Sequence, residues 1–384
     1  MFVLTLIIET PILRYLYRND GVEWPRAVKL SFSVNFISYC VVFVCQLGPL
    51  FFYMGYADIA DKNTPKKWND LSLLNGESGK IITITDTSFG KDNRRRTIIK
   101  MYNVINHSSD TFDPGERVIA INVCDVKGDT LACIVQTDDW NNQSLNVFKL
   151  PGTTPINTIT GKFRDVRLSP DKKKIAALEY VKEASAPKDD TSHFMLGSTC
   201  RLKIFDANSG ALITEAPRMA LDDGLTWTND SMHVVFTSLK DENLFKHDDS
   251  TTKGFGRGYA KEGQFPLLMF DFDLSKKEVN SITEGKDPET VSETYEISFL
   301  RDKGMSDCEA WRWNPKEGKA RLILKEIKSY KHSVSPSGNK LLIQIPHKNP
   351  LGGNYFLTVI DPEHPERKHI VEPSTYGPFR WISD

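Results

Sequence analysis

The sequence predicts an all-β fold of repeated four-stranded units, preceded by an amino-terminal membrane segment. A Ser-Pro-Asp turn between two short strands recurs in degraded form along the chain. Successive units follow one another at a spacing of about 45 residues, which is typical of a repeat fold. The stretch 30–57 contains no charged residue, which is typical of a helix that crosses a bilayer.

The clearest copy of the turn is Ser169-Pro170-Asp171, which separates a strand ending at Leu168 from a strand at 175–178. Proline presets the backbone angle at the second turn position, and the Ser and Asp side chains can accept hydrogen bonds from turn amides. Degraded copies at 228–231 and 335–338 precede further apolar runs. The recurrence predicts β-hairpins repeated along the chain.

Six repeat units can be assigned beyond residue 79, where short β-branched and aromatic runs alternate with clusters of turn residues. Their first recognisable strands lie at 81–85, 118–121, 163–168, 225–227, 295–299 and 329–334. The spacing suits propeller blades of four strands. We therefore expect a six-bladed β-propeller, with seven blades as the alternative.

The two ends of the repeat body complement each other. The segment 379–384 is typical of an inner strand and the start of a turn, whereas the first unit begins at Gly79 without an inner strand. We expect the last residues to complete the first blade and bring Trp381 close to Ile82, which removes exposed sheet edges. The predicted domains are a membrane segment at 1–57, a linker at 58–78 and a propeller at 79–384.

The Ser-Pro-Asp turn, followed after three residues by Ile175-Ala176, resembles the TolB-like or WD40-like β-propeller repeat, often called PD40. The resemblance covers about three quarters of the chain and excludes the first 57 residues. It implies a propeller. It implies little about function, because this fold hosts binding modules, lyases and peptidase accessory domains.

The run 30–57 is longer than the roughly 20 residues that a helix needs to cross a bilayer, so we predict a transmembrane helix there. The apolar stretch 1–17, which carries Glu9 and Arg14, has three interpretations. It is a first helix of a membrane hairpin, which we favour, a re-entrant or interfacial piece, or the tail of a membrane domain that begins upstream. In the last case Glu9 would be a functional group of a transporter-like domain.

Basic residues beside the two apolar stretches predict the orientation. Arg14, Arg18, Arg26 and Lys29 belong to the first stretch and the loop after it, while Lys62, Lys66 and Lys67 follow the second. Cytoplasmic loops carry the excess of Lys and Arg, so the propeller is expected outside the cytoplasm, in a periplasmic or extracellular position. The predicted localisation is an integral membrane protein that contacts the bilayer through its amino-terminal helices.

Composition and motifs exclude several function classes. The 49 basic and 50 acidic residues nearly cancel, so no overall charge favours nucleic acid. The sequence holds no nucleophile elbow, His-Glu-x-x-His pair or Walker loop, so no catalytic residue is assigned. Lys246-His247-Asp248-Asp249 combines imidazole and carboxylates, but no partner at ligand spacing accompanies it. We interpret it as a solvated loop, and no metal or cofactor is assigned.

Two of the six cysteines, Cys124 and Cys133, lie on either side of a predicted turn in the second unit. A disulfide across one hairpin is conceivable. The favoured interpretation is two small buried residues, which is the usual place of a free cysteine.

Two insertions give the best indication of function. They span 181–200 and 239–264 in adjacent units, each between the second and third strands. Equivalent loops of adjacent blades leave the same face, so they are expected to form one patch. Apolar and basic side chains make it suited to a protein partner, with disordered decoration as the alternative. The candidate partner-binding residues are Phe194, Met195, Phe245, His247, Phe255, Arg257 and Tyr259.

The favoured hypothesis is a membrane-anchored binding or scaffolding module. The alternative is an enzyme, a hydrolase or lyase, with its site in the central funnel of the propeller. That alternative requires His, Asp, Glu or Arg side chains that converge on the axis.

Overall fold

The computed structural model describes residues 70–87, 96–115, 118, 120–137, 143–181, 199–221, 224–240, 267–303, 307–327, 329, 331–346, 355–372 and 378–383. The chain divides into two compact units, 1–65 with 348–353 and 66–347 with 354–384. The first unit lies outside the described residues, and with it the predicted membrane hairpin. Within the described residues, no helix has the length and apolar character needed to cross a membrane.

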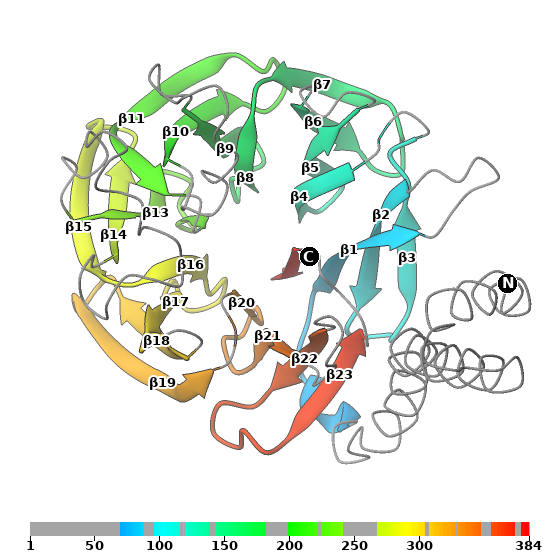
Figure 1. Cartoon of the computed structure of the whole chain (residues 1–384), viewed down its shortest axis with the longest axis vertical. Helices are drawn as coiled ribbons and strands as arrows, with labels where there is room; N and C mark the ends of the chain where they lie inside the picture. Colours follow the sequence, from blue (N-terminus) through cyan, green and yellow to red (C-terminus); the bar gives the residue numbers. More distant parts are fainter. Residues whose placement is uncertain are drawn as a thin grey trace, which may run out of the picture. The chain divides into compact units, whose positions relative to one another are not determined.

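The second unit is a six-bladed β-propeller (Figure 1), as the sequence predicts. Each blade is an antiparallel four-stranded sheet. From the innermost strand outward, the first three blades are β24 (Phe379–Ile382), β1 (Lys80–Thr87), β2 (Arg96–Asn103) and β3 (Ser109–Phe112); β4 (Ala120–Lys127), β5 (Thr130–Gln136), β6 (Gln143–Lys149) and β7 (Pro155–Thr160); and β8 (Phe163–Leu168), β9 (Lys174–Tyr180), β10 (Thr199–Asp206) and β11 (Leu212–Leu221).

Blades 4 to 6 follow the same order. They are β12 (Leu225–Trp227), β13 (His233–Leu239), β14 (Leu267–Asp273) and β15 (Glu278–Glu284); β16 (Lys286–Thr290), β17 (Ile297–Asp302), β18 (Cys308–Asn314) and β19 (Lys319–Ile327); and β20 (His332–Val334), β21 (Leu341–Pro346), β22 (Tyr355–Ile360) and β23 (Lys368–Glu372). A short 3-10 helix, η3 (Leu71–Leu74), precedes β1.

Burial along the strands explains why each blade forms. All seven residues of β5 are buried, because this strand is covered by a neighbouring blade on both faces. The outermost strand β7 alternates between exposed and half-buried residues, the pattern of a strand at the rim. Apolar side chains therefore gather between blades rather than at the centre of the ring.

Among the described residues, six buried hydrophobic clusters occupy the six interfaces between blades, one for each pair of neighbours. The cluster between blades 6 and 1 joins Leu342 and Val359 to Ile81 and Trp381, and η3 adds Leu73. No blade can bury both of its faces alone, so each depends on both neighbours.

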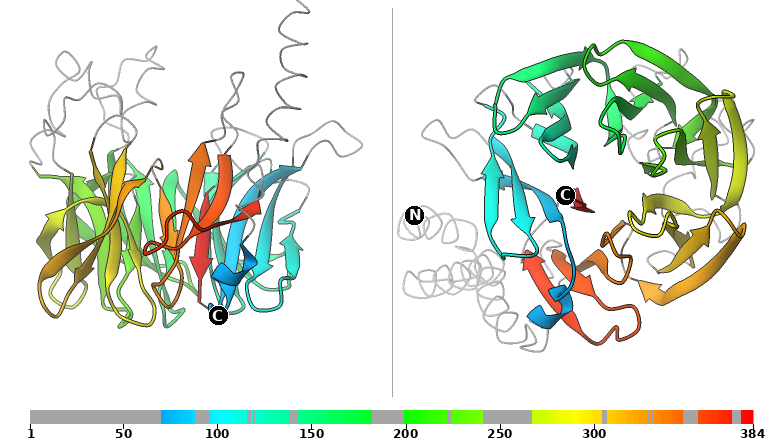
Figure 2. Two further views of the ribbon diagram at one scale, coloured as in Figure 1. Left: turned by 90° about the horizontal axis from the view of Figure 1, so that it is seen from below. Right: turned by 180° about the vertical axis from the view of Figure 1, so that it is seen from behind.

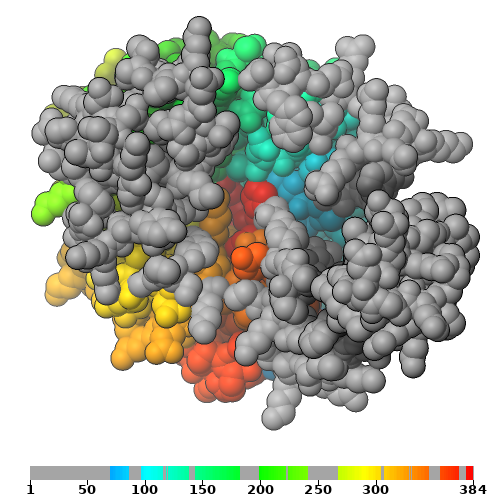
Figure 3. Space-filling model, viewed as in Figure 1, coloured from blue at the N-terminus to red at the C-terminus, as the bar shows by residue number. Residues whose placement is uncertain are grey.

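The carboxy-terminal strand completes the first blade. β24 pairs antiparallel with β1, and Trp381 lies opposite Ile81. The Trp381 indole N–H donates to the Ser78 carbonyl at 2.9 Å, and its backbone N–H donates to Ser333 Oγ at 2.9 Å. Atoms of this segment, coloured red, lie at the centre of the ring in the ribbon and space-filling views (Figures 2 and 3). The pairing is the one that the complementary ends of the repeat body indicate, and it leaves no unpaired edge inside the blade.

The recurring turn has a second role beyond reversing the chain. Ser169 Oγ donates to Asp171 at 2.5 Å and accepts the Lys174 N–H at 2.9 Å, which closes the turn internally. The Asp171 backbone N–H then donates to Ser231 Oγ in the turn of the next blade, at 3.0 Å. The motif therefore joins blades as well as strands.

Hydrogen bonds between the turns of neighbouring blades recur around one face of the ring. Asn229 donates to the Ser292 carbonyl at 2.7 Å, and the Glu293 N–H donates to the Pro336 carbonyl at 3.1 Å. Ser337 Oγ donates to the Glu77 carboxylate at 2.8 Å, which links blade 6 to blade 1. The turns of neighbouring blades thus contact each other, and these contacts give the recurring turn residues a second structural role.

Replacement of Trp381 by alanine should lower the free energy of unfolding by about 3–5 kcal/mol, because it empties the interface between blades 6 and 1. Chemical denaturation followed by fluorescence or circular dichroism measures the loss. Ile105→Ala is the matched control, since Ile105 is 64% exposed and its truncation should change stability by less than about 0.5 kcal/mol. Equal effects of the two substitutions would contradict a closing role for β24.

Candidate functional site

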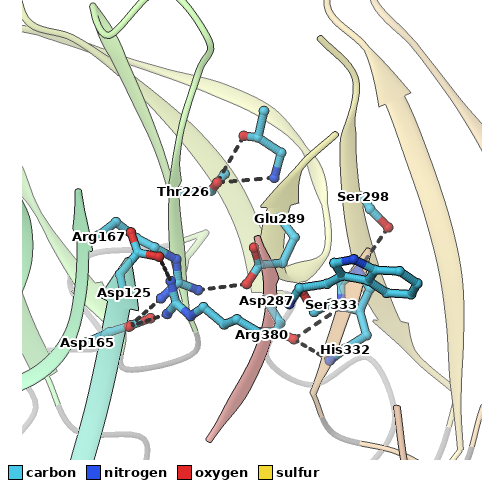
Figure 4. A network of polar contacts seen from close by, with 12 residues as sticks. Asp125, Asp165, Arg167, Thr226, Asp287, Glu289, Ser298, His332, Ser333 and Arg380 are labelled. Atoms are coloured by element: carbon cyan, nitrogen blue, oxygen red, sulfur yellow. Dashed lines mark hydrogen bonds and ion pairs between the residues drawn. The ribbon is translucent and has the colours of Figure 1, made fainter. Parts of the chain in front are cut away.

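Polar side chains of the innermost strands converge on the axis of the propeller (Figure 4). All six innermost strands contribute at least one of them. We call this set the axial network; its members are Asp125, Asp165, Arg167, Thr226, Asp287, Glu289, His332 and Arg380. All are buried except Glu289, which is half-buried. The convergence of acidic, basic and imidazole groups is the arrangement that the enzyme alternative requires.

Two arginines organise the axial network. Arg167 on β8 lies 2.7 Å from Asp165 and 2.8 Å from Glu289 on β16. Arg380 on β24 lies 2.9 Å from Asp165 and 3.6 Å from Asp125 on β4. The pair between Arg167 and Glu289 joins blade 3 to blade 5, and the pair between Arg380 and Asp165 joins blade 1 to blade 3. Because these blades are not neighbours, the side chains span the axis at this level.

Burial shapes the charge state of the carboxyls. It raises the pKa of Glu289 to about 7, and the guanidinium of Arg167 opposes that shift. Burial also raises the pKa values of Asp125 and Asp165, again against Arg167. Burial alone would raise the pKa of Asp287, but the hydrogen bond and charge of His332 hold it below its usual value. Of these shifts, the one at Glu289 places a change of charge near neutral pH.

Ser298, His332 and Asp287 form a chain of hydrogen bonds beside the axis. Ser298 Oγ lies 2.9 Å from His332 Nε2, and His332 Nδ1 lies 3.2 Å from Asp287 Oδ2. The order of groups is that of a nucleophile, a base and an orienting acid. Ser298 is 1% exposed and His332 is 2% exposed, so a substrate has no access to either in this conformation. The chain of bonds fixes the imidazole and links β17 to β20.

Within the described residues, no cluster of His, Cys, Asp and Glu side chains could hold a metal ion. The four carboxyls of the axial network are each engaged by an arginine, a histidine or a backbone N–H. The geometry supports a structural ion-pair network at the axis better than a ligand site.

The seven candidate partner-binding residues lie outside the described residues: Phe194, Met195, Phe245, His247, Phe255, Arg257 and Tyr259. The strands that bear the insertions are described. One insertion joins β9 to β10 and the other joins β13 to β14, the second and third strands of blades 3 and 4. Their positions in the chain are those expected from the sequence.

The bases of the two insertions are tied together. The Val181 N–H donates to the Thr199 carbonyl at 3.1 Å and closes the base of the first insertion. Thr199 lies opposite Leu221 at the end of β11. From the same strand, Arg218 donates to the Lys240 carbonyl at 3.0 Å, at the base of the second insertion. Both insertions therefore leave one face of the propeller from neighbouring points.

Most of the axial network is not predicted from the sequence. The first strand predicted in the fifth unit lies at 295–299. In the structure the innermost strand of this blade is the earlier strand β16, which carries Asp287 and Glu289. The run Lys286-Asp287-Pro288-Glu289-Thr290 is polar and interrupted by proline, so it lacks the pattern of a buried strand. One signal could have found it. The turn at 291–296 precedes a strand, as in the other units, and so an inner strand should precede that turn.

Arg380→Met should cost about 3–5 kcal/mol of unfolding free energy, because it leaves Asp165 and Asp125 buried with one cation fewer. Adding Asp165→Asn should cost less than the sum of the two single losses, since the two residues interact directly. Thermal or urea unfolding of the four proteins gives the coupling energy. The exposed pair Arg201–Glu215, at 3.2 Å, is the control, and Arg201→Met should cost only about 0–1 kcal/mol. Additive losses at the axis would contradict the network.

Glu289→Gln should change how stability depends on pH. The pKa of Glu289 is raised on folding to about 7, so its contribution is fully present below the unfolded pKa and is lost as pH rises through about 7. The stability of the unsubstituted protein relative to the variant should therefore fall between about pH 5 and pH 7. Urea midpoints measured across this range test the sign. A difference that is constant, or that grows with pH, would show that Glu289 is not desolvated.

Comparisons with known proteins agree on the fold. No model of a protein family and no curated protein matches the sequence. Among solved structures, the chain is similar to TolB from Acinetobacter baumannii, with a TM-score of 0.55 and 12% identity over 82% of this chain and 70% of that chain. It is also similar to the Pyrococcus horikoshii acylaminoacyl peptidase, with a TM-score of 0.47 and 10% identity over 79% of this chain and 47% of that chain.

A third similar structure is an oligogalacturonate lyase in complex with manganese, with a TM-score of 0.44 and 12% identity over 77% of this chain and 86% of that chain. At these identities the likeness concerns the fold alone. The chain is thus a six-bladed β-propeller with the fold of TolB, and its activity has to be argued from its own residues.

Proposed function

We propose that the chain is a membrane-anchored β-propeller that binds a protein partner outside the cytoplasm, through the insertions of blades 3 and 4. The main support for the proposal is that the side chains of the axial network fill the centre of the ring. Arg167 and Arg380 make ion pairs between blades that are not neighbours, so the centre of the ring is used for holding the blades together. Recognition then falls to the loops on the faces, where propellers and other rigid scaffolds usually bind.

The tied bases of the insertions support one composite surface rather than two independent loops. Arg218 also lies over the ring of Phe270 on β14, with its guanidinium carbon 3.9 Å from the ring centroid. The same arginine thus contacts both strands that carry the second insertion and holds the base of that loop to blade 3. Loop bases that are held in place lower the entropy that the loops lose when they bind a partner.

The anchor is supported by the uncharged run 30–57 and the orientation by the basic residues that precede it. A surface of apolar anchors among charges, such as Phe194, Phe245 and Tyr259 with Arg257, suits a protein partner. The evidence for the anchor is independent of the axial network.

The second candidate is a hydrolase or lyase with a site at the axis. It is favoured by one observation, the hydrogen-bonded order of Ser298, His332 and Asp287 beside a glutamate whose pKa is about 7. The burial of Ser298 argues against it. Reaction of a serine-directed phosphonate with Ser298 in the native protein would favour this candidate over the binding module.

The binding proposal predicts that both insertions are needed for one partner. Residues 183–197 or 242–264 are replaced by short Gly-Ser turns in the full chain, which is then cross-linked in native membranes and captured. A partner found with the unchanged chain should be lost at least tenfold from each variant, because each removes half of the surface. Quantitative mass spectrometry of the cross-linked products measures the loss.

The matched control replaces 138–142, which joins β5 to β6 at the equivalent position of blade 2. This variant should keep the partner, and all variants should unfold at similar temperatures. Retention of every partner by both insertion variants would overturn the proposed binding surface.

The membrane anchor is tested in the same membrane preparations. Carbonate washing should leave the chain in the membrane pellet and release a variant that lacks 1–57.

A further inference from the structure

Cys124 on β4 and Cys133 on β5 lie directly opposite each other in blade 2. Lys127 lies opposite Thr130, so Gly128 and Asp129 form a two-residue hairpin turn. Gly128 has a φ of 58°, the left-handed conformation that the first position of such a turn requires. The pairs of an antiparallel hairpin alternate between hydrogen-bonded and non-hydrogen-bonded types. Counted from the closing pair at the turn, the cysteines occupy a non-hydrogen-bonded pair.

This type of pair has the shorter separation. Its Cα atoms lie about 4.5 Å apart, at the lower end of the roughly 4.4–6.8 Å found across disulfides. Both cysteines belong to the hydrophobic cluster between blades 1 and 2, which also contains Ile82, Ile99 and Phe148. Their side chains therefore project from the same face of the sheet toward blade 1.

We infer that Cys124 and Cys133 form a structural cross-strand disulfide when the chain folds in an oxidising compartment. The occurrence of the bond in the cell rests on the proposed position of the propeller outside the cytoplasm, because reducing compartments keep thiols reduced. The geometry of the pair does not depend on that position.

The oxidant is a small or protein disulfide, and the reaction is thiol–disulfide exchange. One cysteine thiolate attacks a sulfur of the oxidant, a mixed disulfide forms, and one thiolate of the oxidant leaves. The second cysteine thiolate then attacks the protein sulfur of the mixed disulfide and expels the other thiolate. Two protein thiols are oxidised to one disulfide, one oxidant disulfide is reduced to two thiols, and the two protons pass to those thiolates or to water.

The reaction belongs to the folding chain rather than to the folded protein. Cys124 is 4% exposed and Cys133 is 0% exposed, and burial raises the pKa of both thiols. Folded thiols of this kind are poor nucleophiles. Only residues 125–132 separate the two cysteines, so the hairpin can bring them together before blade 1 covers them. Packing of the blades then shields the finished bond from reductants.

The other described cysteines provide matched controls. Cys200 lies opposite Tyr180 and Ala220, and Cys308 lies opposite Asp302 and Ile327. Both are buried, as Cys124 and Cys133 are, but neither faces a cysteine across the described strands. Burial therefore does not distinguish Cys124 and Cys133 from the other two cysteines. The strand register does, because it sets these two opposite each other.

In the test, the full chain is reduced and unfolded, and is then refolded in detergent with a mixture of oxidised and reduced glutathione. The refolded protein is alkylated and digested, and its peptides are identified by mass spectrometry. A peptide pair joined through Cys124 and Cys133 should form, be lost in Cys124→Ala and Cys133→Ala, and persist in Cys200→Ala and Cys308→Ala. The oxidised protein should melt several degrees higher than the reduced one. Native reduced protein exposed to the same mixture should form the link at least tenfold more slowly.

A refolded protein of native fluorescence in which both thiols are still alkylated would overturn the inference, whatever the compartment. The position is tested separately, by alkylation of free thiols as cells are lysed in acid. A chain that forms the link in glutathione but is fully reduced in cells would overturn the proposed extracytoplasmic position and leave the pairing intact. If an alanine variant fails to refold, the linked peptide of the unchanged chain still decides the outcome.

Discussion

The ring depends on one strand that carries two different side chains in sequence. Arg380 on β24 points to the axis and pairs with carboxylates of blades 2 and 3, and Trp381 packs between blades 6 and 1. Successive residues of a strand face opposite sides, so a slip of one residue would exchange the guanidinium and the indole. The slip would place a charge in an apolar interface and leave two buried aspartates with one arginine. The pairing register between β24 and β1 is therefore fixed by Arg380 on one face of the strand and by Trp381 on the other.

The axial network and the hydrophobic clusters between blades stabilise different parts of the propeller. Apolar area is buried between neighbouring blades, while two of the ion pairs, Arg167–Glu289 and Arg380–Asp165, join blades that are not neighbours. Buried ion pairs contribute little net stability, because the cost of desolvation offsets most of the attraction, but they are sensitive to geometry. A ring of seven blades would have a wider axis and would separate Arg167 from Glu289. The cross-axis pairs thus favour six blades over seven.

The sequence was sufficient for the class of fold and favoured six blades over seven, because the turn at 169–171 and its copies at 228–231 and 335–338 mark hairpins in three of the units by local chemistry. Closure could also be predicted, since an inner strand at 379–382 had no other partner. The polar strand β16 was missed, because its conformation comes from the neighbouring blades and not from its own residues. The axial network could not be predicted for the same reason. It joins residues from six strands, and no local pattern records which of them meet.

Trp381 and Ser78 are bonded to each other although 303 positions separate them along the chain. A link between such distant parts is among the last to form, because a long stretch of backbone must be ordered before its ends meet. The propeller therefore passes through an open arc of blades before it becomes a wheel. During that interval the β1 edge is bare, and it is the point at which a second chain could insert a strand in place of β24.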